Sequence, residues 1–199
     1  MKKVLLALSI VALSSAAQAA SVFSDNFDAN SLGLNATPTG WTVTSGTVDI
    51  IGSPNFYDFI PGSGRYIDLD GSTGDAGVLS KTLLLAAGTQ YTATFDLAGN
   101  HRNASPETVT GILGVGIGNV SNTFSLSQNA GWTSYSLVFT PTATTNYVLS
   151  FGNSGGDNIG MLLDNVNVTA VPEPETYAMM LAGLGLLGFM ARRRKQQTA

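Results

Sequence analysis

Residues 90–97 read Gln-Tyr-Thr-Ala-Thr-Phe-Asp-Leu, and polar and apolar side chains alternate along the whole segment. Successive side chains of a β-strand point to opposite faces, so Tyr91, Ala93, Phe95 and Leu97 share one face. The same period recurs at 133–140 and 146–152, where aromatic or aliphatic residues occupy every second position. These three segments predict strands that each bury one face.

Weaker versions of this pattern predict further short strands, each bounded by Gly, Asn, Asp or Pro. The expected segments are residues 42–51, 65–70, 78–85, 109–117, 123–126 and 161–168, and helical periodicity is sustained nowhere between the two ends of the chain. About nine antiparallel strands with one apolar face each bury those faces most simply by stacking two sheets. We therefore predict an all-β fold for residues 20–170, a two-sheet antiparallel β-sandwich of the jelly-roll type.

Charge and composition argue against several classes of function. Residues 20–171 contain 3 basic and 11 acidic side chains, whereas phosphate binding needs clustered Lys and Arg, so we expect no nucleic acid partner. The chain has no cysteine, which excludes disulfides and thiol catalysis. Its single histidine, His101, lies in a polar segment that is expected to be a loop, which argues against a catalytic triad. We expect no enzymatic activity.

The first 19 residues have the three parts of a cleavable signal peptide. Two lysines precede an apolar run of ten residues, 4–13, and the small residues Ala17 and Ala19 stand where signal peptidase reads the chain. Ten helical residues cover only about 15 Å of the roughly 30 Å bilayer core, which disfavours an uncleaved anchor. We expect signal peptidase to cut before Ala20.

The last part of the chain, 171–199, combines prolines, an apolar run and a basic block. Residues 171–175 read Val-Pro-Glu-Pro-Glu, and the two prolines predict a stiff, extended connector. Residues 177–191 carry no charge and are expected to form a short transmembrane helix, which would span about 22 Å. The basic block at 192–195 should stay on the cytoplasmic side, so the preceding domain would lie outside.

This order of elements resembles the PEP-CTERM sorting signal of Gram-negative bacteria. The motif that the resemblance implies consists of Pro172, Glu173, Pro174, Arg192, Arg193 and Arg194. In that family an exosortase, a membrane-embedded enzyme similar to cysteine transpeptidases, is thought to cut near the Pro-Glu-Pro in cells that make exopolysaccharide. The resemblance implies an exported protein that the membrane holds temporarily and that then reaches the cell surface or extracellular matrix. An ordinary permanent tail anchor is the alternative.

A second resemblance covers most of residues 23–168. Its motifs are Asp-Asn-Phe-Asp at 25–28, Gly-Trp at 40–41 with Gly-Thr-Val-Asp-Ile at 46–50, Tyr-Ile-Asp-Leu-Asp-Gly at 66–71 and Leu-Asp-Asn-Val at 163–166. In order and spacing they are similar to landmarks of galactose-binding-like jelly rolls, which include carbohydrate-binding modules. The resemblance implies a domain that binds exopolysaccharide. The alternatives are a purely structural biofilm-matrix protein, a glycoside-active enzyme or an ice-binding protein.

Two sets of residues are candidates for binding. Related jelly rolls often join their first and last strands with a calcium ion, and the resemblance places Asp28 and Asp164 at the matching positions, although no cofactor is required. Alternatively, Asp28 caps a turn and Asp164 accepts backbone hydrogen bonds. Phe56, Tyr57 and Phe59 lie in a Gly-rich loop and are candidates for stacking on a sugar. The alternative is that two of these aromatic side chains cover the open end of the sandwich.

Overall fold

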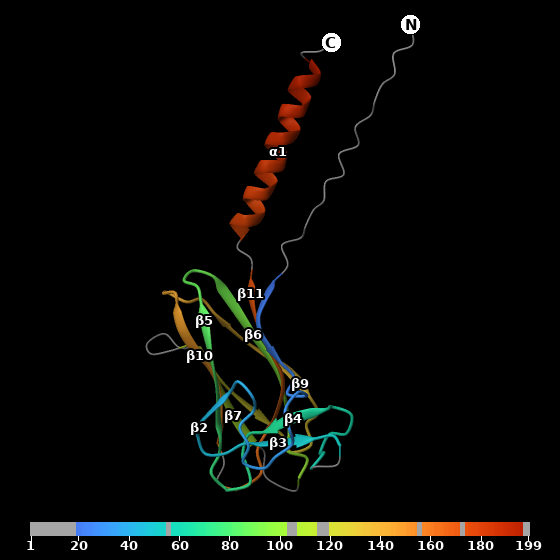
Figure 1. The fold of residues 1–199 in the computed structure, drawn as a ribbon, viewed down its shortest axis with the longest axis vertical. Helices are drawn as coiled ribbons and strands as arrows, with labels where there is room; N and C mark the ends of the chain where they lie inside the picture. Colours follow the sequence, from blue (N-terminus) through green and yellow to red (C-terminus); the bar gives the residue numbers. More distant parts are fainter. Residues whose placement is uncertain are drawn as a thin grey trace. The chain divides into compact units, whose positions relative to one another are not determined.

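The computed structural model describes residues 19–54, 57–102, 107–114, 120–154, 157–171 and 174–196, which form eleven strands and one helix (Figure 1). The elements are β1 Ala20–Asp25, β2 Thr42–Ser45, β3 Asp49–Gly52, β4 Arg65–Asp68, β5 Val78–Leu85, β6 Gln90–Ala98, β7 Glu107–Gly114, β8 Val120–Leu126, β9 Thr133–Phe139, β10 Thr145–Ser154, β11 Leu162–Val171 and α1 Pro174–Gln196. The strands belong to one compact unit, Ala19–Glu173.

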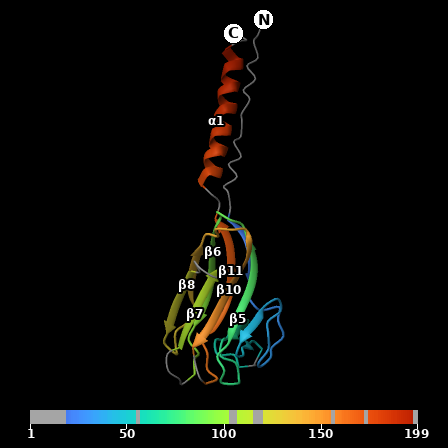
Figure 2. The ribbon, with the colours of Figure 1, turned by 90° about the vertical axis from the view of Figure 1, so that its left-hand side faces the viewer.

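The strands pair antiparallel in two sheets, which confirms the predicted β-sandwich. One sheet has the order β3-β4-β11-β6-β9, and β1 also pairs with β11. The other sheet has the order β2-β5-β10-β7-β8, and Figure 2 shows β5, β10, β7 and β8 side by side. The first predicted strand, β6, lies between β11 and β9, with Tyr91 opposite both Ala170 and Phe139.

Aromatic side chains from both sheets form the centre of the core. On β6 the apolar face predicted from the sequence is buried, and Phe95 is 1% exposed. Its ring packs edge-on against Phe151 of β10 in the other sheet, with ring centroids 4.9 Å apart. Trp41 lies beside Phe151 at 6.3 Å. Burial of one such side chain contributes about 1.5–3 kcal/mol, so contacts of this kind hold the two sheets together.

The segment predicted as one strand at 42–51 is two strands in different sheets. Its first half, β2, pairs with β5, and its second half, β3, pairs with β4. The chain crosses between the sheets at Gly46, which has a φ of 57°. A Cβ at this position would lie 2.0 Å from the carbonyl oxygen of Ala76. Only glycine fits both the backbone angle and the close contact.

The sequence patterns did not predict strand β1. Residues 20–25 read Ala-Ser-Val-Phe-Ser-Asp, and the strand pairs only with β11. Val22 is 40% exposed, and no residue of β1 is fully buried. Because a strand at this position buries little surface, its sequence carries no clear apolar alternation. The described part of the chain begins at residue 19, so Ala17 lies outside it, and β1 starts at the predicted mature N-terminus, Ala20.

The C-terminal helix covers the expected segment 177–191 and extends beyond it at both ends. Helix α1 runs from Pro174 to Gln196 and includes Arg192, Arg193 and Arg194, while Val171 ends β11. Of the predicted connector, Val171 belongs to β11 and Pro174 and Glu175 belong to α1, whereas Pro172 and Glu173 lie outside the described residues. Proline is tolerated in the first turn of a helix because its missing N–H would have no partner there.

The described residues contain no helix with an apolar stretch long enough to cross a bilayer.

Candidate functional site

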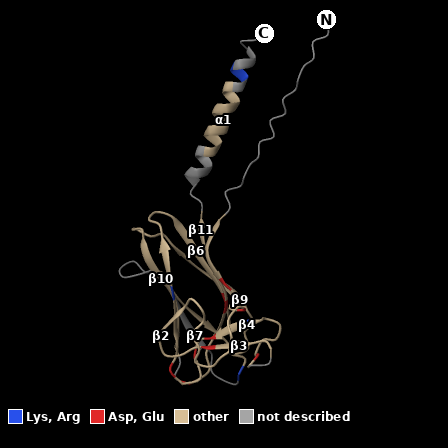
Figure 3. Cartoon of the chain, in the orientation of Figure 1, with Lys and Arg blue, Asp and Glu red and all other residues tan. Residues whose placement is uncertain are grey.

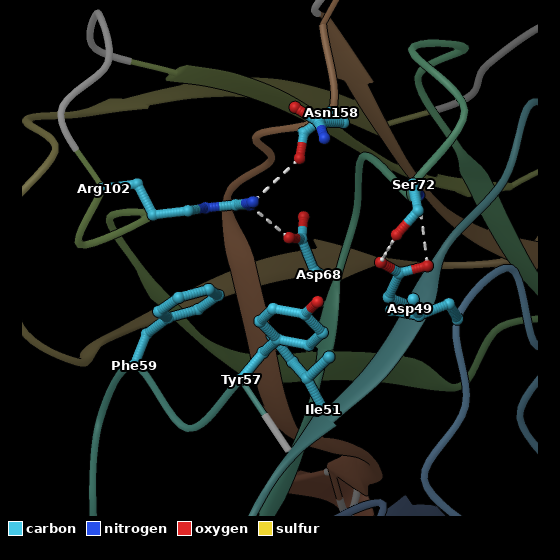
Figure 4. Close-up of a pocket in the computed structure, with 9 residues that line it drawn as sticks. Asp49, Ile51, Tyr57, Phe59, Asp68, Ser72, Arg102 and Asn158 are labelled. Carbon is cyan, nitrogen blue, oxygen red and sulfur yellow. Dashed lines mark hydrogen bonds and ion pairs between the residues drawn. The ribbon is translucent and has the colours of Figure 1, made fainter. Parts of the chain in front are cut away.

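The loop between β3 and β4 forms part of the wall of two cavities. We call the first the aromatic pocket; it has a volume of about 100 Å³ and is shown in Figure 4. Its lining residues are Leu34, Asp49, Ile51, Tyr57, Phe59, Asp68, Ser72, Arg102 and Asn158. Aromatic and aliphatic surface thus lies next to carboxylate, hydroxyl, amide and guanidinium groups, a combination that is typical of pockets for small polar ligands.

Arg102 connects the aromatic and acidic sides of the aromatic pocket. Its guanidinium carbon lies 4.8 Å from the ring centroid of Phe59, within the range of a cation–π contact. The same guanidinium forms an ion pair with Asp68 and donates a hydrogen bond to the carbonyl oxygen of Asn158 at 2.9 Å (Figure 4). Arg102 therefore holds Phe59 and Asp68 in place together.

Asp68, at the end of β4, and Asp70, two residues later, are both buried. Asp68 is 2% exposed and Asp70 is 0% exposed. The Asp68 carboxylate accepts hydrogen bonds from the backbone N–H groups of Asp70 (3.1 Å) and Gly160 (3.0 Å). Burial raises the pKa of Asp68 to about 7, and the charge of Arg102 opposes this rise.

Asp49 shapes the opposite wall of the aromatic pocket. Its carboxylate accepts hydrogen bonds from the backbone N–H groups of Asn35 (2.6 Å) and Ser72 (3.2 Å) and from the Ser72 hydroxyl (2.6 Å). Three donors fix this side chain, so Asp49 and Ser72 form a pre-organised polar rim. Tyr57, by contrast, is 55% exposed and offers its ring to solvent at the mouth of the pocket.

The second cavity, which we call the acidic cavity, has a volume of about 290 Å³. Its lining residues are Asn26, Asp28, Gly62, Ser63, Asp96, Trp132, Asp164 and Asn165. The structure thus brings Asp28 and Asp164 to one site, because β1 pairs with β11 and places Asp25 opposite Val166. Figure 3 shows that acidic residues gather in the part of the sandwich that contains β3 and β4.

Local backbone geometry places the carboxylates in the acidic cavity. The pairing of β11 with β6 shifts between Asp164 and Asn167, a bulge in which Asn165 has a φ of 49°. Bulges redirect side chains in this way. The Asn165 amide donates a hydrogen bond to the Asp96 carboxylate at 3.0 Å. Burial raises the pKa of Asp164 to about 7, and repulsion by Asp28 and Asp96 adds to the rise.

Asp28 and Asp164 were predicted either to bind calcium or to accept local hydrogen bonds, and the structure contains features that fit each alternative. The Asp28 carboxylate accepts hydrogen bonds from the backbone N–H of Arg65 and the Asn26 amide, both at 2.8 Å. Asp164 accepts one from the backbone N–H of Asn165 at 2.7 Å. Among the described residues, no group of three or more acidic, His or Cys side chains is placed to hold a metal. The calcium site therefore stays a prediction.

The sequence identified only part of the aromatic pocket. Tyr57 and Phe59 line it together, with ring centroids 6.3 Å apart, whereas Phe56 lies outside the described residues. Phe59 also packs against the buried cluster of Ile51, Tyr66, Ala98 and Leu162. This contact fits the alternative that some of these aromatic side chains cover the open end of the sandwich. Sequence reasoning missed Asp49, Arg102 and Asn158, because no motif links these distant segments. Trp132 packs against the same buried cluster and also lines the acidic cavity.

Comparisons with known families find two matches. The PEP-CTERM protein-sorting motif matches residues 170–195, and a family described as a protein of unknown function, DUF642, matches residues 19–169. The sorting motif confirms the predicted export across the inner membrane, with temporary anchoring before placement at the surface or outside the cell. It also implies processing by exosortase. A search of curated proteins finds no match.

The fold is similar to that of a solved xylan-binding domain and a solved adhesin domain. The CBM22-1 xylan-binding domain of Paenibacillus barcinonensis Xyn10C is 12% identical, with a TM-score of 0.52 over 80% of this chain and 99% of that one. The K3 cleaved adhesin domain of Lys-gingipain from Porphyromonas gingivalis is 16% identical, with a TM-score of 0.51 over 75% and 99%. This chain spans 29% of the CBM22-1–GH10 modules of Clostridium thermocellum xylanase 10B, at 14% identity, 78% coverage of this chain and a TM-score of 0.47. The first two likenesses confirm the jelly-roll fold.

Proposed function

Because the chain belongs to the DUF642 family and carries a PEP-CTERM sorting signal, we propose that it binds exopolysaccharide at the cell surface or in the extracellular matrix. The observation that carries the proposal is the aromatic pocket, where Tyr57 and Phe59 lie beside fixed polar groups. Sugar rings present apolar C–H faces that pack on aromatic rings, and their hydroxyls hydrogen-bond with carboxylate and guanidinium groups.

The volume of the aromatic pocket and the charge of the domain restrict the class of polysaccharide that could bind. A volume of about 100 Å³ lies below the roughly 300–1,000 Å³ that is usual for whole small-molecule ligands. The aromatic pocket would therefore take one sugar unit of a longer chain, with Tyr57 as the exposed platform. The many carboxylates of the domain would repel an anionic polymer, so we propose a neutral polysaccharide. A xylan-binding domain among the structural neighbours supports a carbohydrate ligand in general.

The aromatic pocket supports binding rather than hydrolysis. Glycoside hydrolysis needs two carboxyl groups that act as acid, base or nucleophile on either side of the bond. Of the two carboxylates in this pocket, Asp68 is paired with Arg102, and Asp49 accepts three hydrogen bonds. Both carboxylates therefore already have structural partners inside the pocket. We therefore propose a non-enzymatic role.

Tyr57→Ala is expected to weaken polysaccharide binding about tenfold, because losing one aromatic stacking contact costs about 0.5–1.5 kcal/mol beyond the buried area. The measurement is a glycan array with the mature protein, followed by calorimetry with the best ligand. Leu84→Ala is the matched control, since it removes an apolar side chain that is 67% exposed and lies outside both cavities. Equal affinity of the two variants would argue against this site, and no binding by the wild type would favour a purely structural matrix protein.

We also propose that calcium binds in the acidic cavity through Asp28 and Asp164. A cation between these carboxylates would cancel the repulsion that raises the pKa of Asp164. Calcium at 100 times its Kd would stabilise the folded state by about 2.7 kcal/mol, a rise in Tm of several degrees. Asp164→Asn should reduce the rise in Tm that calcium causes. In chelator it should increase the Tm, because it removes the repulsion between the neighbouring carboxylates. An unchanged calcium response in Asp164→Asn would contradict the proposal.

A further inference from the structure

Three buried polar side chains lie outside both cavities. Asp70 follows β4, Asn100 follows β6, and Asn153 belongs to β10 of the other sheet. Asp70 and Asn100 are 0% exposed, and Asn153 is 9% exposed. None of the three lines the aromatic pocket or the acidic cavity. The proposed function leaves this group unexplained.

Five of the six polar side-chain atoms of these three residues lack partners, the exception being the Asn100 oxygen, which accepts a hydrogen bond from the backbone N–H of Arg102. Neither carboxylate oxygen of Asp70 takes part in a hydrogen bond, and the same is true of both polar atoms of the Asn153 side chain and of the Asn100 amide nitrogen. Asn153 lies close enough for its amide to lower the pKa of Asp70, but the two side chains do not reach hydrogen-bond geometry. Each buried polar group without a partner costs about 1–3 kcal/mol, and a charged one costs more. A folded domain normally fills such a site with water or an ion.

Negative side chains outnumber positive ones around Asp70. Burial raises the pKa of Asp70 to about 6, and the negative charges of Asp157 and Asp49 contribute to the rise. Arg102 opposes the rise, and its guanidinium is already paired with Asp68. Among the described residues, no side chain forms an ion pair with Asp70.

The backbone around Asp70 is held tightly in place. A Cβ on Gly160 would lie 2.3 Å from the Asp70 nitrogen, so the loop before β11 packs directly against this residue. Gly77 donates a backbone hydrogen bond to Leu69 at 2.8 Å and accepts one from Asn153 at 3.1 Å. These contacts keep the segment after β4, strand β10 and the loop before β11 close together. A site formed by the three segments is therefore pre-organised.

We propose that Asp70, Asn153 and Asp157 bind one calcium ion, which joins β4, β10 and the loop before β11. Calcium takes six to eight oxygen ligands in flexible geometry, and a carboxylate can supply two of them. Because the described residues contain no set of three acidic, His or Cys side chains suited to a metal, the amide oxygen of Asn153, carbonyl groups and water must complete the shell. Such an all-oxygen set suits calcium and not the metals that prefer nitrogen or sulfur ligands.

The test counts calcium ions on the mature protein by equilibrium dialysis and follows Tm in calcium and in chelator. Asp164→Asn removes a ligand of the acidic cavity, so one bound calcium should remain in this variant. The double variant Asp70→Asn/Asp164→Asn should bind none. Asp75→Asn is the charge-matched control, because it changes an exposed carboxylate of the same loop and should leave the calcium count of Asp164→Asn unaltered.

A second variant keeps the proposal testable if Asp70→Asn does not fold. Asn153→Asp adds a third carboxylate to the site, so it should increase calcium affinity about tenfold and lower the Tm in chelator. Polysaccharide binding is measured on the same samples, and its loss or retention reports on the aromatic pocket alone. No calcium on Asp164→Asn, or a calcium retained by the double variant, would overturn the proposal.

Discussion

Replacing Pro172, Glu173 and Pro174 with three alanines is expected to leave the protein in the membrane as an uncut precursor. The sorting motif matches residues 170–195, and this change removes its Pro-Glu-Pro while the apolar segment 177–191 and the basic block stay intact. The anchor is thus preserved and only the recognised segment is lost, so the released form should fall to background. Cell fractionation with detection of the precursor measures the effect.

The control for this experiment is a triple alanine substitution of residues 196–198, which lie just beyond the matched motif. It changes as many side chains close to the same end and should be processed as the wild type. Mass spectrometry of the wild-type surface form should find no residues from 192–199. Their presence on that form would mean that the tail is a permanent anchor.

Arg102→Ala is expected to lower the free energy of unfolding by about 3–5 kcal/mol, the usual cost of removing one partner of a buried ion pair. The variant leaves Asp68, whose side chain is 3% exposed, without its counter-ion, and it removes the guanidinium that lies over Phe59. Urea unfolding in chelator measures the change. Lys81→Ala is the control, because Lys81 is also cationic and contacts an aromatic ring, Phe23, but forms no ion pair with Asp68.

The effect of Arg102→Ala should depend on pH. The pKa of Asp68 is raised from 3.8 to about 7, so the folded domain binds this proton more tightly than the unfolded chain. Protonation of Asp68 therefore stabilises the folded state. This stabilisation is complete below about pH 4 and is lost as the pH rises through about 7. Without Arg102 the cost at pH 8 should therefore exceed the cost at pH 5, and Asp68→Asn should restore part of the stability. A loss no larger than that of Lys81→Ala at both pH values would contradict this role.

Local sequence patterns predicted the strands that bury one complete face. Strand β5 has the bounds expected at 78–85, and β6 extends the expected segment by one residue. Both contribute alternate side chains to the core, where burial selects apolar residues at every second position. The pattern fails at 42–51, where two short strands join different sheets, and at β1, where little is buried.

Less of the candidate site than of the fold could be predicted, because local patterns do not show which distant segments meet. Tyr57 and Phe59 stand out in the sequence because aromatic side chains in a Gly-rich loop are unusual. Arg102 and Asn158 carry no such signal, because they reach the aromatic pocket from loops that follow β6 and precede β11. Burial of Asp68 and Asp70 was also unpredictable, since acidic residues on a strand are ordinarily exposed.

The sequence by itself determined the sorting tail, the absence of cysteine chemistry and the positions of the fully periodic strands, because each of these depends on neighbouring residues alone. Only the tertiary structure decided that Arg102 pairs with Asp68 and lies over Phe59, and that the buried Asp70 carboxylate is left without a hydrogen-bond partner. The physical reason is that burial and electrostatic pairing arise between segments that are far apart along the chain, and the order in which strands pair sets which of them meet.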